Sequence, residues 1–261
     1  MVAAVRRRLR PVVRSLRYVR HRLLPRASYA ADAEDIAVQL LVGPVRTFVD
    51  VGANDGFTCS NTLLFALRGA RGLCFEPDRS NFARLAELYR LQVAVECIAE
   101  GISDRASMAT LRCDGLLSSL SGDEDPGLES LLAGHRTTGA ELSEIELKPL
   151  AHWLSHRPPF RSADLLSIDV EGHELSVLRG IDWTATPKPA RCVVVETHAQ
   201  GETGTWRHRH FEAIADLLES KSYREVAASA NNTFWLYTED IVVSRVASAR
   251  ARLPHYTWRS P

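Results

Sequence analysis

The sequence predicts an α/β protein with a mostly parallel sheet that is covered by helices on both faces. Short apolar strands alternate with helical segments along most of the chain, which is the pattern of βαβ units. The last two expected strands are joined through Asn231-Asn232 and predict an antiparallel hairpin at one edge. Of the 261 residues, 45% are apolar and 25% are charged, which excludes a disordered or fibrous chain. No apolar run approaches the ~18 residues of a membrane span.

Each expected element has a local signal in the sequence. Strands are expected where β-branched, aromatic and aliphatic residues run together, as in Thr47-Phe48-Val49. Helices are expected where apolar residues recur at helical spacing, as Phe82, Leu85 and Leu88 do behind the capping residue Asp78. The expected helices cover residues 34–41, 60–68, 78–91, a short segment around 153, 174–178 and 210–220. The expected strands cover residues 47–51, 72–76, 93–98, 107–112, 145–150, 164–170, 191–196, 223–227 and 233–237.

Charge and loop content divide the chain into parts. Residues 1–31 contain nine Arg and no acidic residue, so they carry +9 and leave the remainder of this neutral chain at −9. We expect a basic amphipathic extension at 1–31, the main domain at 32–240 and a C-terminal extension at 241–261. Within the domain, residues 114–140 are rich in Gly, Ser, Asp and Glu, which predicts a long loop or lid.

The N-terminal extension combines its arginines with an apolar stripe. Seven apolar residues from Val2 to Leu23 recur at alternating spacings of three and four, so a helix would align them, although Pro11 interrupts it. A secretory signal is not expected, because the segment lacks an apolar core of ~7–15 residues and a cleavage site. Such a helix can lie on an anionic membrane, dock on a partner, follow a nucleic acid or cover the domain. We expect residues 1–26 to contact the inner face of a membrane peripherally.

The cysteines indicate a reducing compartment. Their number is odd, they form no CxxC pair, and three of the five lie in apolar, strand-like runs. Packed, reduced thiols are typical of a cytoplasmic protein. The five are Cys59, Cys74, Cys97, Cys113 and Cys192.

Polar residues at the ends of the expected strands are the candidate site residues, because ligands of parallel sheets bind beyond the carboxyl ends of strands. The turn from Gly52 to Gly56 differs from the GxGxxG of dinucleotide oxidoreductases, but its two glycines would let backbone approach a bound group, with Asn54 between them. Glu76 could accept hydrogen bonds from ribose hydroxyls. The strand-end residues are Asp50, Glu76, Asp169 with Glu171, and Glu196 with His198.

Three motifs follow one another in the order and spacing of a known family. Asp50-Val51-Gly52-Ala53-Asn54-Asp55-Gly56 precedes Cys74-Phe75-Glu76-Pro77, and Ile168-Asp169-Val170-Glu171-Gly172-His173-Glu174-Leu175 comes later. With these motifs the chain resembles the FkbM family of S-adenosylmethionine-dependent methyltransferases from about residue 34 to residue 237.

The resemblance implies a Rossmann-like class I methyltransferase fold and S-adenosylmethionine as the cofactor. It implies that the glycine turn cradles the methionine part of the cofactor and that Glu76 binds the ribose. It further implies that Ser103 and Asp104 lie near the adenine. The expected cofactor-binding residues are Asp50, Gly52, Asn54, Gly56, Glu76, Ser103, Asp104 and Asp169.

Methyl transfer to a hydroxyl requires that the acceptor be held in line and lose a proton. Positioning can contribute up to ~7–11 kcal/mol and a general base ~100- to 10,000-fold. We expect His173 to be the base, because imidazole titrates near neutrality and the motif places it just beyond a strand. Asp169 would line the active site, Glu171 would orient His173, and Glu174 is most simply an acid in the first turn of a helix.

A catalytic metal is the main alternative to a base. Asp169, Glu171, His173, Glu196 and His198 form an oxygen-rich set that suits Mg or Mn better than Zn. The metal reading rests mainly on Asp169, Glu196 and His198. His208 and His210 are expected in a polar loop.

The expected function is O-methylation of a sugar, glycolipid or polyketide-type small molecule. A nucleic-acid methyltransferase is the first rival; only the arginine-rich tail favours it, and the acidic body makes a nucleic-acid partner an unfavourable choice. A non-catalytic cofactor-binding protein is the second rival, and it is disfavoured because every motif position is filled.

Overall fold

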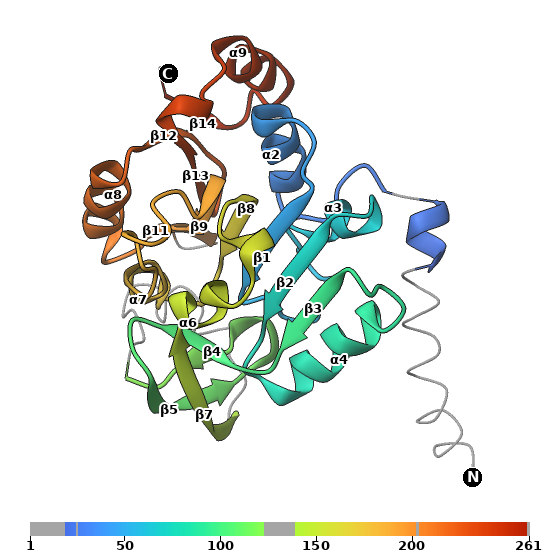
Figure 1. Ribbon diagram of the computed structural model, residues 1–261, viewed down its shortest axis with the longest axis vertical. Helices are drawn as coiled ribbons and strands as arrows, with labels where there is room; N and C mark the ends of the chain where they lie inside the picture. The colour runs from blue at the N-terminus through green and yellow to red at the C-terminus, as the bar shows by residue number, and fades with distance from the viewer. Residues whose placement is uncertain (1–18, 25, 123–138, 202–203, 260–261) are drawn as a thin grey trace.

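The computed structural model describes residues 19–24, 26–122, 139–201 and 204–259, without the side chains of Leu116 and of residues 198–207. Its main sheet has eight strands in the order β14-β12-β13-β9-β8-β1-β2-β3 (Figure 1). The five strands from β9 to β3 are parallel, and β13, β12 and β14 each run antiparallel to the preceding neighbour. The bounds are β1 (Thr47–Val51), β2 (Arg71–Phe75), β3 (Val95–Ile98), β8 (Ala163–Ile168), β9 (Ala190–Glu196), β12 (Tyr223–Ala228), β13 (Asn232–Tyr237) and β14 (Thr257–Trp258).

Helices cover both faces of this sheet, so the expected fold class is confirmed. Alternate residues of a strand point to opposite faces, and in β1 Phe48 belongs to one apolar core whereas Val49 belongs to the other. The Phe48 face is covered by α2 (Glu34–Val42), α3 (Leu63–Leu67), α4 (Arg79–Tyr89) and α9 (Val243–Arg252). The Val49 face is covered by α6 (Leu150–Ser155), α7 (Glu174–Arg179) and α8 (Phe211–Ser220).

A second sheet, which the sequence predicts only in part, stands beside the carboxyl ends of the main strands. Its four strands have the order β4-β7-β5-β6. Strands were expected at 107–112 and 145–150; the second begins four residues earlier, and the two shortest strands carry too little pattern to be expected. The bounds are β4 (Gly101–Ser103), β5 (Ser107–Cys113), β6 (Ser119–Leu120) and β7 (Glu141–Pro149).

Further short elements complete the chain. The hairpin of β10 (His198–Gly201) and β11 (Gly204–Arg207) was not expected. Within the expected lid at 114–140, η1 (Gly115–Leu117) and β6 are ordered onto the second sheet, and residues 123–138 lie outside the described residues. The remaining 3-10 turns are η2 (Pro158–Phe160) and η3 (Thr238–Asp240).

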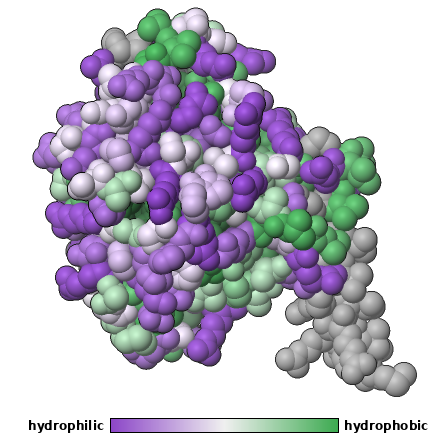
Figure 2. All heavy atoms as spheres, in the orientation of Figure 1, coloured by the Kyte–Doolittle hydropathy of each residue, from purple (hydrophilic) through white to green (hydrophobic). Residues whose placement is uncertain are grey.

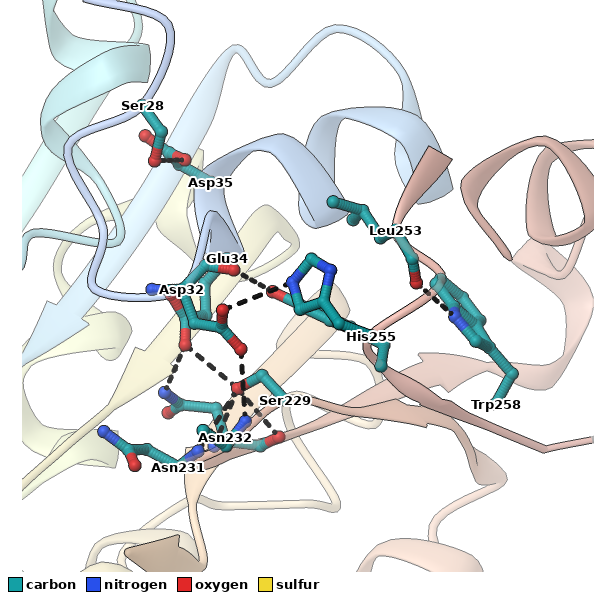
Figure 3. A network of polar contacts seen from close by, with 12 residues as sticks. Ser28, Asp32, Glu34, Asp35, Ser229, Asn231, Asn232, Leu253, His255 and Trp258 are labelled. Carbon is teal, nitrogen blue, oxygen red and sulfur yellow. Dashed lines mark hydrogen bonds and ion pairs between the residues drawn. The ribbon is translucent and has the colours of Figure 1, made fainter. Parts of the chain in front are cut away.

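The described part of the C-terminal segment 241–261 packs onto the domain. Helix α9 packs against α2, and β14 extends the main sheet at β12. Tyr256 donates a hydrogen bond to the carbonyl of Asp32 at 2.7 Å, and His255 lies 3.2 Å from the same residue's carboxylate (Figure 3). The C-terminal segment therefore contacts the first residue of the domain.

Two further expectations concern the cysteines and the helices. The cysteines are free thiols, with Cys74 and Cys192 buried and Cys97 half-buried in their strands. None of the helices in the described part of the chain has the length and apolar character needed to cross a membrane.

Candidate active site

A cavity of about 320 Å³ opens at the carboxyl ends of β1, β2, β8 and β9. Strand order reverses here, because the chain passes from β1 to β2 on one side while β8 and β9 lie on the other. Its volume falls in the range of small-molecule sites. The cavity therefore lies where ligands bind in doubly wound sheets.

The glycine turn after β1 is held against the neighbouring strands. The N–H groups of Gly52 and Ala53 both donate to the carbonyl of Phe75 at 3.0 Å. Gly52 has φ +87°, and a Cβ there would lie 1.7 Å from the carbonyl oxygen of Asp169, so only glycine fits. Gly52 and Asn54 line the cavity, as expected for cofactor-binding residues.

Gly56, the other glycine of the turn, was expected to contact the cofactor, but it packs against helix α4. It does not line the cavity, and a Cβ there would lie 2.6 Å from Leu85 of α4. Its φ of +73° and the tight contact explain the glycine by packing, without a bound group.

Glu76 is locked in place at the end of β2. One carboxylate oxygen accepts the N–H of Asn54 at 2.8 Å, and the other accepts the N–H of Asp78 at 2.7 Å. Burial raises the pKa of Glu76 to about 7, against the opposing effect of these two N–H groups. Each oxygen keeps a lone pair for a further donor, so the carboxylate can receive two hydroxyl groups from the cavity.

Asp50 and its neighbours fix the floor of the cavity between β1 and β8. Asp50 accepts a hydrogen bond from the hydroxyl of Thr62 at 2.6 Å, and burial raises its pKa to about 6. Asn61 donates to the hydroxyl of Ser167 at 3.2 Å. The segment before α3 is thereby tied to both central strands.

The described part of the expected lid covers one wall of the cavity. Asp78 caps α4 by accepting the N–H groups of Ser80 and Asn81, which confirms the expected cap. Its second carboxylate oxygen accepts the hydroxyl of Ser118 at 3.1 Å, and Asn81 donates to the carbonyl of Gly115 at 2.8 Å. Residues 117–120 consequently line the cavity.

Ser103 and Asp104, expected near the adenine, do not line the cavity; Gly101 and Ile102 do. The hydroxyl of Ser103 lies 2.9 Å from Nε2 of His173 and donates to Asp104 at 3.2 Å. Because that hydroxyl proton is used by Asp104, the Ser103 oxygen is left to accept from His173. The pair therefore orients the imidazole, which does line the cavity.

Three carboxylates converge beyond β8 and β9. Ligand atoms of Asp169, Glu171 and Glu196 all lie within 4.8 Å of one another. Burial, followed by the charge of Glu174, raises the pKa of Asp169 to about 7. Burial and the charge of Asp169 raise the pKa of Glu196 well above its usual range. We call these three residues the carboxylate cluster.

The cluster stands on strained backbone. Glu171 has φ +55°, a conformation that costs a residue with a side chain about 1 kcal/mol. Asn54 and Cys59 share this left-handed conformation and also line the cavity. Strain of this kind is concentrated at functional sites.

Glu174, expected to act only as an acid in the first turn of a helix, also holds the turn before that helix in place. One of its oxygens accepts the N–H groups of Val170 and Gly172 at 3.0 and 3.2 Å, which closes the turn that presents Glu171. The other lies 2.7 Å from Nε2 of His208, and neither side chain is exposed. Burial alone would raise the pKa of Glu174, but the contact with His208 holds it below its usual range.

Other residues of the site escaped the sequence reasoning. His208 was assigned to a polar loop, yet it is buried and supports the turn from the far side of the chain. The sequence predicts Asn231 and Asn232 only as a hairpin connection, yet both line the cavity. The side chain of His198, which was part of the metal alternative, lies outside the described residues.

The doubly wound sheet, with a glycine turn and a buried acid at the carboxyl ends of its central strands, is that of a class I methyltransferase fold. The model of the methyltransferase FkbM domain matches residues 50–225. The chain therefore belongs to the FkbM family of methyltransferases. No curated protein sequence matches it.

Solved structures resemble the chain at low sequence identity. A crystal structure of methyltransferase FkbM from Methylobacillus flagellatus KT has 14% identity and a TM-score of 0.48, covering 77% of this chain and 48% of that chain. A precorrin-6y C5,15-methyltransferase from Geobacter metallireducens GS-15 has 10% identity and a TM-score of 0.39, covering 80% of this chain and 91% of that one. The present chain thus spans about half the length of the FkbM structure.

Proposed function

We propose that the chain transfers a methyl group from S-adenosylmethionine to a hydroxyl of a sugar, glycolipid or polyketide-type small molecule. The observation that carries the proposal is the acidic lining of the cavity. Six carboxyl side chains line it, and the described lining residues include no Lys or Arg. A sulfonium cofactor with an ammonium group is favoured by such a lining, whereas the phosphates of a nucleic acid or of NAD are repelled. The six are Asp50, Glu76, Glu100, Asp169, Glu171 and Glu196.

The residues present fit this cofactor. Glu76 offers two acceptor sites to vicinal ribose hydroxyls, and Gly52 and Asn54 of the glycine turn line the cavity beside it. When bound, the cofactor supplies a methyl group whose bond to sulfur breaks as the acceptor oxygen attacks. The chain must hold that oxygen in line and take its proton.

His173 stays the predicted proton acceptor. Its Nε2 lies 2.9 Å from the hydroxyl of Ser103, which fixes the orientation of the ring at the cavity wall. Asp169 and Glu171 would line the acceptor side of the cavity.

Calorimetry and a methylation assay test the proposal. S-adenosylhomocysteine should bind to the purified chain, NAD should not, and Glu76→Ala should weaken the binding by ~1–3 kcal/mol. Methyl groups from labelled cofactor should enter the lipid or glycan fraction of extracts. Incorporation only into RNA or DNA would contradict the proposed substrate class, and binding of NAD alone would contradict the cofactor.

An exposed apolar patch supports the proposed membrane contact. Val19 and Leu23 of the N-terminal segment line one groove with Leu91, and Leu24 and Val93, close to them in sequence, are also exposed. Figure 2 shows apolar surface on the flank that carries the N-terminal segment. Leu23 is 74% exposed and Val93 is 100% exposed. The first 31 residues, which include Val19, Leu23 and Leu24, contain nine arginines, and each can contribute ~1 kcal/mol at an anionic surface. We propose that this flank rests on an anionic membrane that carries an amphiphilic acceptor.

Vesicle sedimentation tests the membrane contact. Leu23→Asp with Leu24→Asp should release the protein from anionic vesicles. Met108→Asp with Leu142→Asp is the matched control, because it adds the same charge and these residues are 64% and 63% exposed on β5 and β7, away from this flank (Figure 1). High salt should weaken retention of the unchanged protein, since the arginines are screened. Equal retention of both variants would contradict the contact.

A further inference from the structure

Two buried side-chain oxygens at the carboxylate cluster have no hydrogen-bond partner in the described part of the chain. Glu196 is 9% exposed, and its Oε2 has no hydrogen-bond partner. Its register partner on β13, Asn232, is 5% exposed and has an unpartnered Oδ1. Both residues line the cavity. These two residues face each other across the β9–β13 pair and line the same cavity as Asp169 and Glu171, and a buried oxygen without a donor costs free energy unless a positive group fills the site.

The amide of Asn232 cannot turn to satisfy its neighbour. Its Nδ2 donates to Glu34 at 3.2 Å, and the hydroxyl of Ser229 donates to the same carboxylate oxygen at 2.9 Å (Figure 3). Reversing the amide would place its oxygen against the Glu34 carboxylate. The oxygen of Asn232 is therefore held as an acceptor.

The spacing of the cluster matches a hard cation. An ion with oxygen ligands at ~2.1 Å, the distance for Mg, places opposite ligands ~4.2 Å apart, and the ~2.3–2.6 Å of Ca gives ~4.6–5.2 Å. The three ligand atoms of the cluster lie within 4.8 Å of one another. Carboxylate and amide oxygens are the ligands that such ions prefer.

We propose that Asp169, Glu171 and Glu196 bind one hard divalent cation (Mg, Mn or Ca) at the wall of the cavity, with Asn232 as a further oxygen ligand. The inference rests on the proposed function for its role, because the cation would coordinate the acceptor hydroxyl. Coordination lowers the pKa of a bound hydroxyl and fixes its oxygen for attack. A vicinal diol, which offers two oxygens to one ion, is the acceptor that such a site selects.

Titration with Mn alone tests the site without any methyl acceptor. Electron paramagnetic resonance and calorimetry should show one Mn bound per unchanged chain. Glu196→Gln and Asp169→Asn should each weaken that binding at least tenfold. Glu100→Gln is the matched control, since it removes one negative charge from the same cavity outside the cluster; it should change the Mn affinity less than threefold.

The outcomes separate this inference from the proposed function. If the unchanged chain binds S-adenosylhomocysteine but no Mn, Mg or Ca below millimolar concentration, the cation site is wrong and the cofactor assignment stands. Equal losses in Glu100→Gln and Glu196→Gln would also overturn it, because only the overall charge would then matter. Should both cluster variants fail to fold, the titration of the unchanged chain still decides. If Mn binds and S-adenosylhomocysteine does not, the cation site stands and the proposed function fails.

Discussion

The buried pair of Glu174 and His208 allows a quantitative test of how the site is supported. The N–H of His210 donates to Nδ1 of His208 at 2.9 Å, so that nitrogen carries no proton and Nε2 carries the one that faces Glu174. Replacing His208 by alanine removes this donor and leaves a fully buried carboxylate with two backbone N–H groups. Losing one partner of a buried pair typically costs ~3–5 kcal/mol.

We therefore expect His208→Ala to lower the free energy of unfolding by ~3–5 kcal/mol. In a domain of this size that corresponds to a fall in Tm of about 6–20 °C. Urea denaturation followed by circular dichroism gives the free energy directly. The matched control is His210→Ala, which keeps the backbone N–H and should cost less than ~1 kcal/mol.

A double-mutant cycle separates the pair from simple packing. His208→Ala leaves the Glu174 carboxylate buried without its partner, and Glu174→Gln removes that charge. The loss of unfolding free energy in the double variant should therefore be smaller than the sum of the two single losses by ~2 kcal/mol or more. Additive losses would refute the reasoning, since they would mean that the two side chains stabilise the turn independently. A loss below ~1 kcal/mol in His208→Ala would refute it as well.

Three further predictions concern the cavity. Gly52→Ala should destabilise the protein by more than ~3 kcal/mol in urea denaturation, because its Cβ would meet a backbone oxygen at 1.7 Å; Gly69→Ala, with φ +92° and open space, should cost only ~1 kcal/mol. Glu76 has a pKa raised to about 7, and ribose hydroxyls favour its ionised form, so binding of S-adenosylhomocysteine slightly below that pH should release protons in calorimetry; the release should vanish in Glu76→Gln. His173→Ala should lower kcat by ~100- to 10,000-fold in the methylation assay while the cofactor Kd stays within about threefold; equal losses in both would show that the residue only shapes the pocket.

The central strands could be predicted from the sequence because burial on both faces leaves a continuous apolar run. Strand β9, for example, is buried at six of its seven positions, and its β-branched residues identify it without any partner. The C-terminal helix α9 has only two buried residues, so its pattern was too weak to be expected. The short strands β4 and β6 are stabilised by their neighbours rather than by their own composition.

The candidate site was predictable where residues follow a strand and unpredictable where distant segments meet. Asp169 and Glu196 end neighbouring strands, so their proximity follows from the strand order. The contact of Glu174 with His208 joins positions 34 residues apart and has no local signal. The role of Gly56 is a second example. The local sequence suggests a cofactor contact, because it contains no sign that Leu85, 29 residues later, leaves no room for a side chain at position 56.

The polar residues that line the cavity come mainly from two separate stretches of the chain. Apart from Asp169, the residues expected to hold the cofactor come from the first 120 positions, whereas the carboxylate cluster and Asn232 all come after position 160. On the proposed function, we expect acceptor preference to transfer as one block between family members. A hybrid that joins this chain up to β6 to the second half of another family member should keep its affinity for the cofactor and inherit the other parent's acceptor.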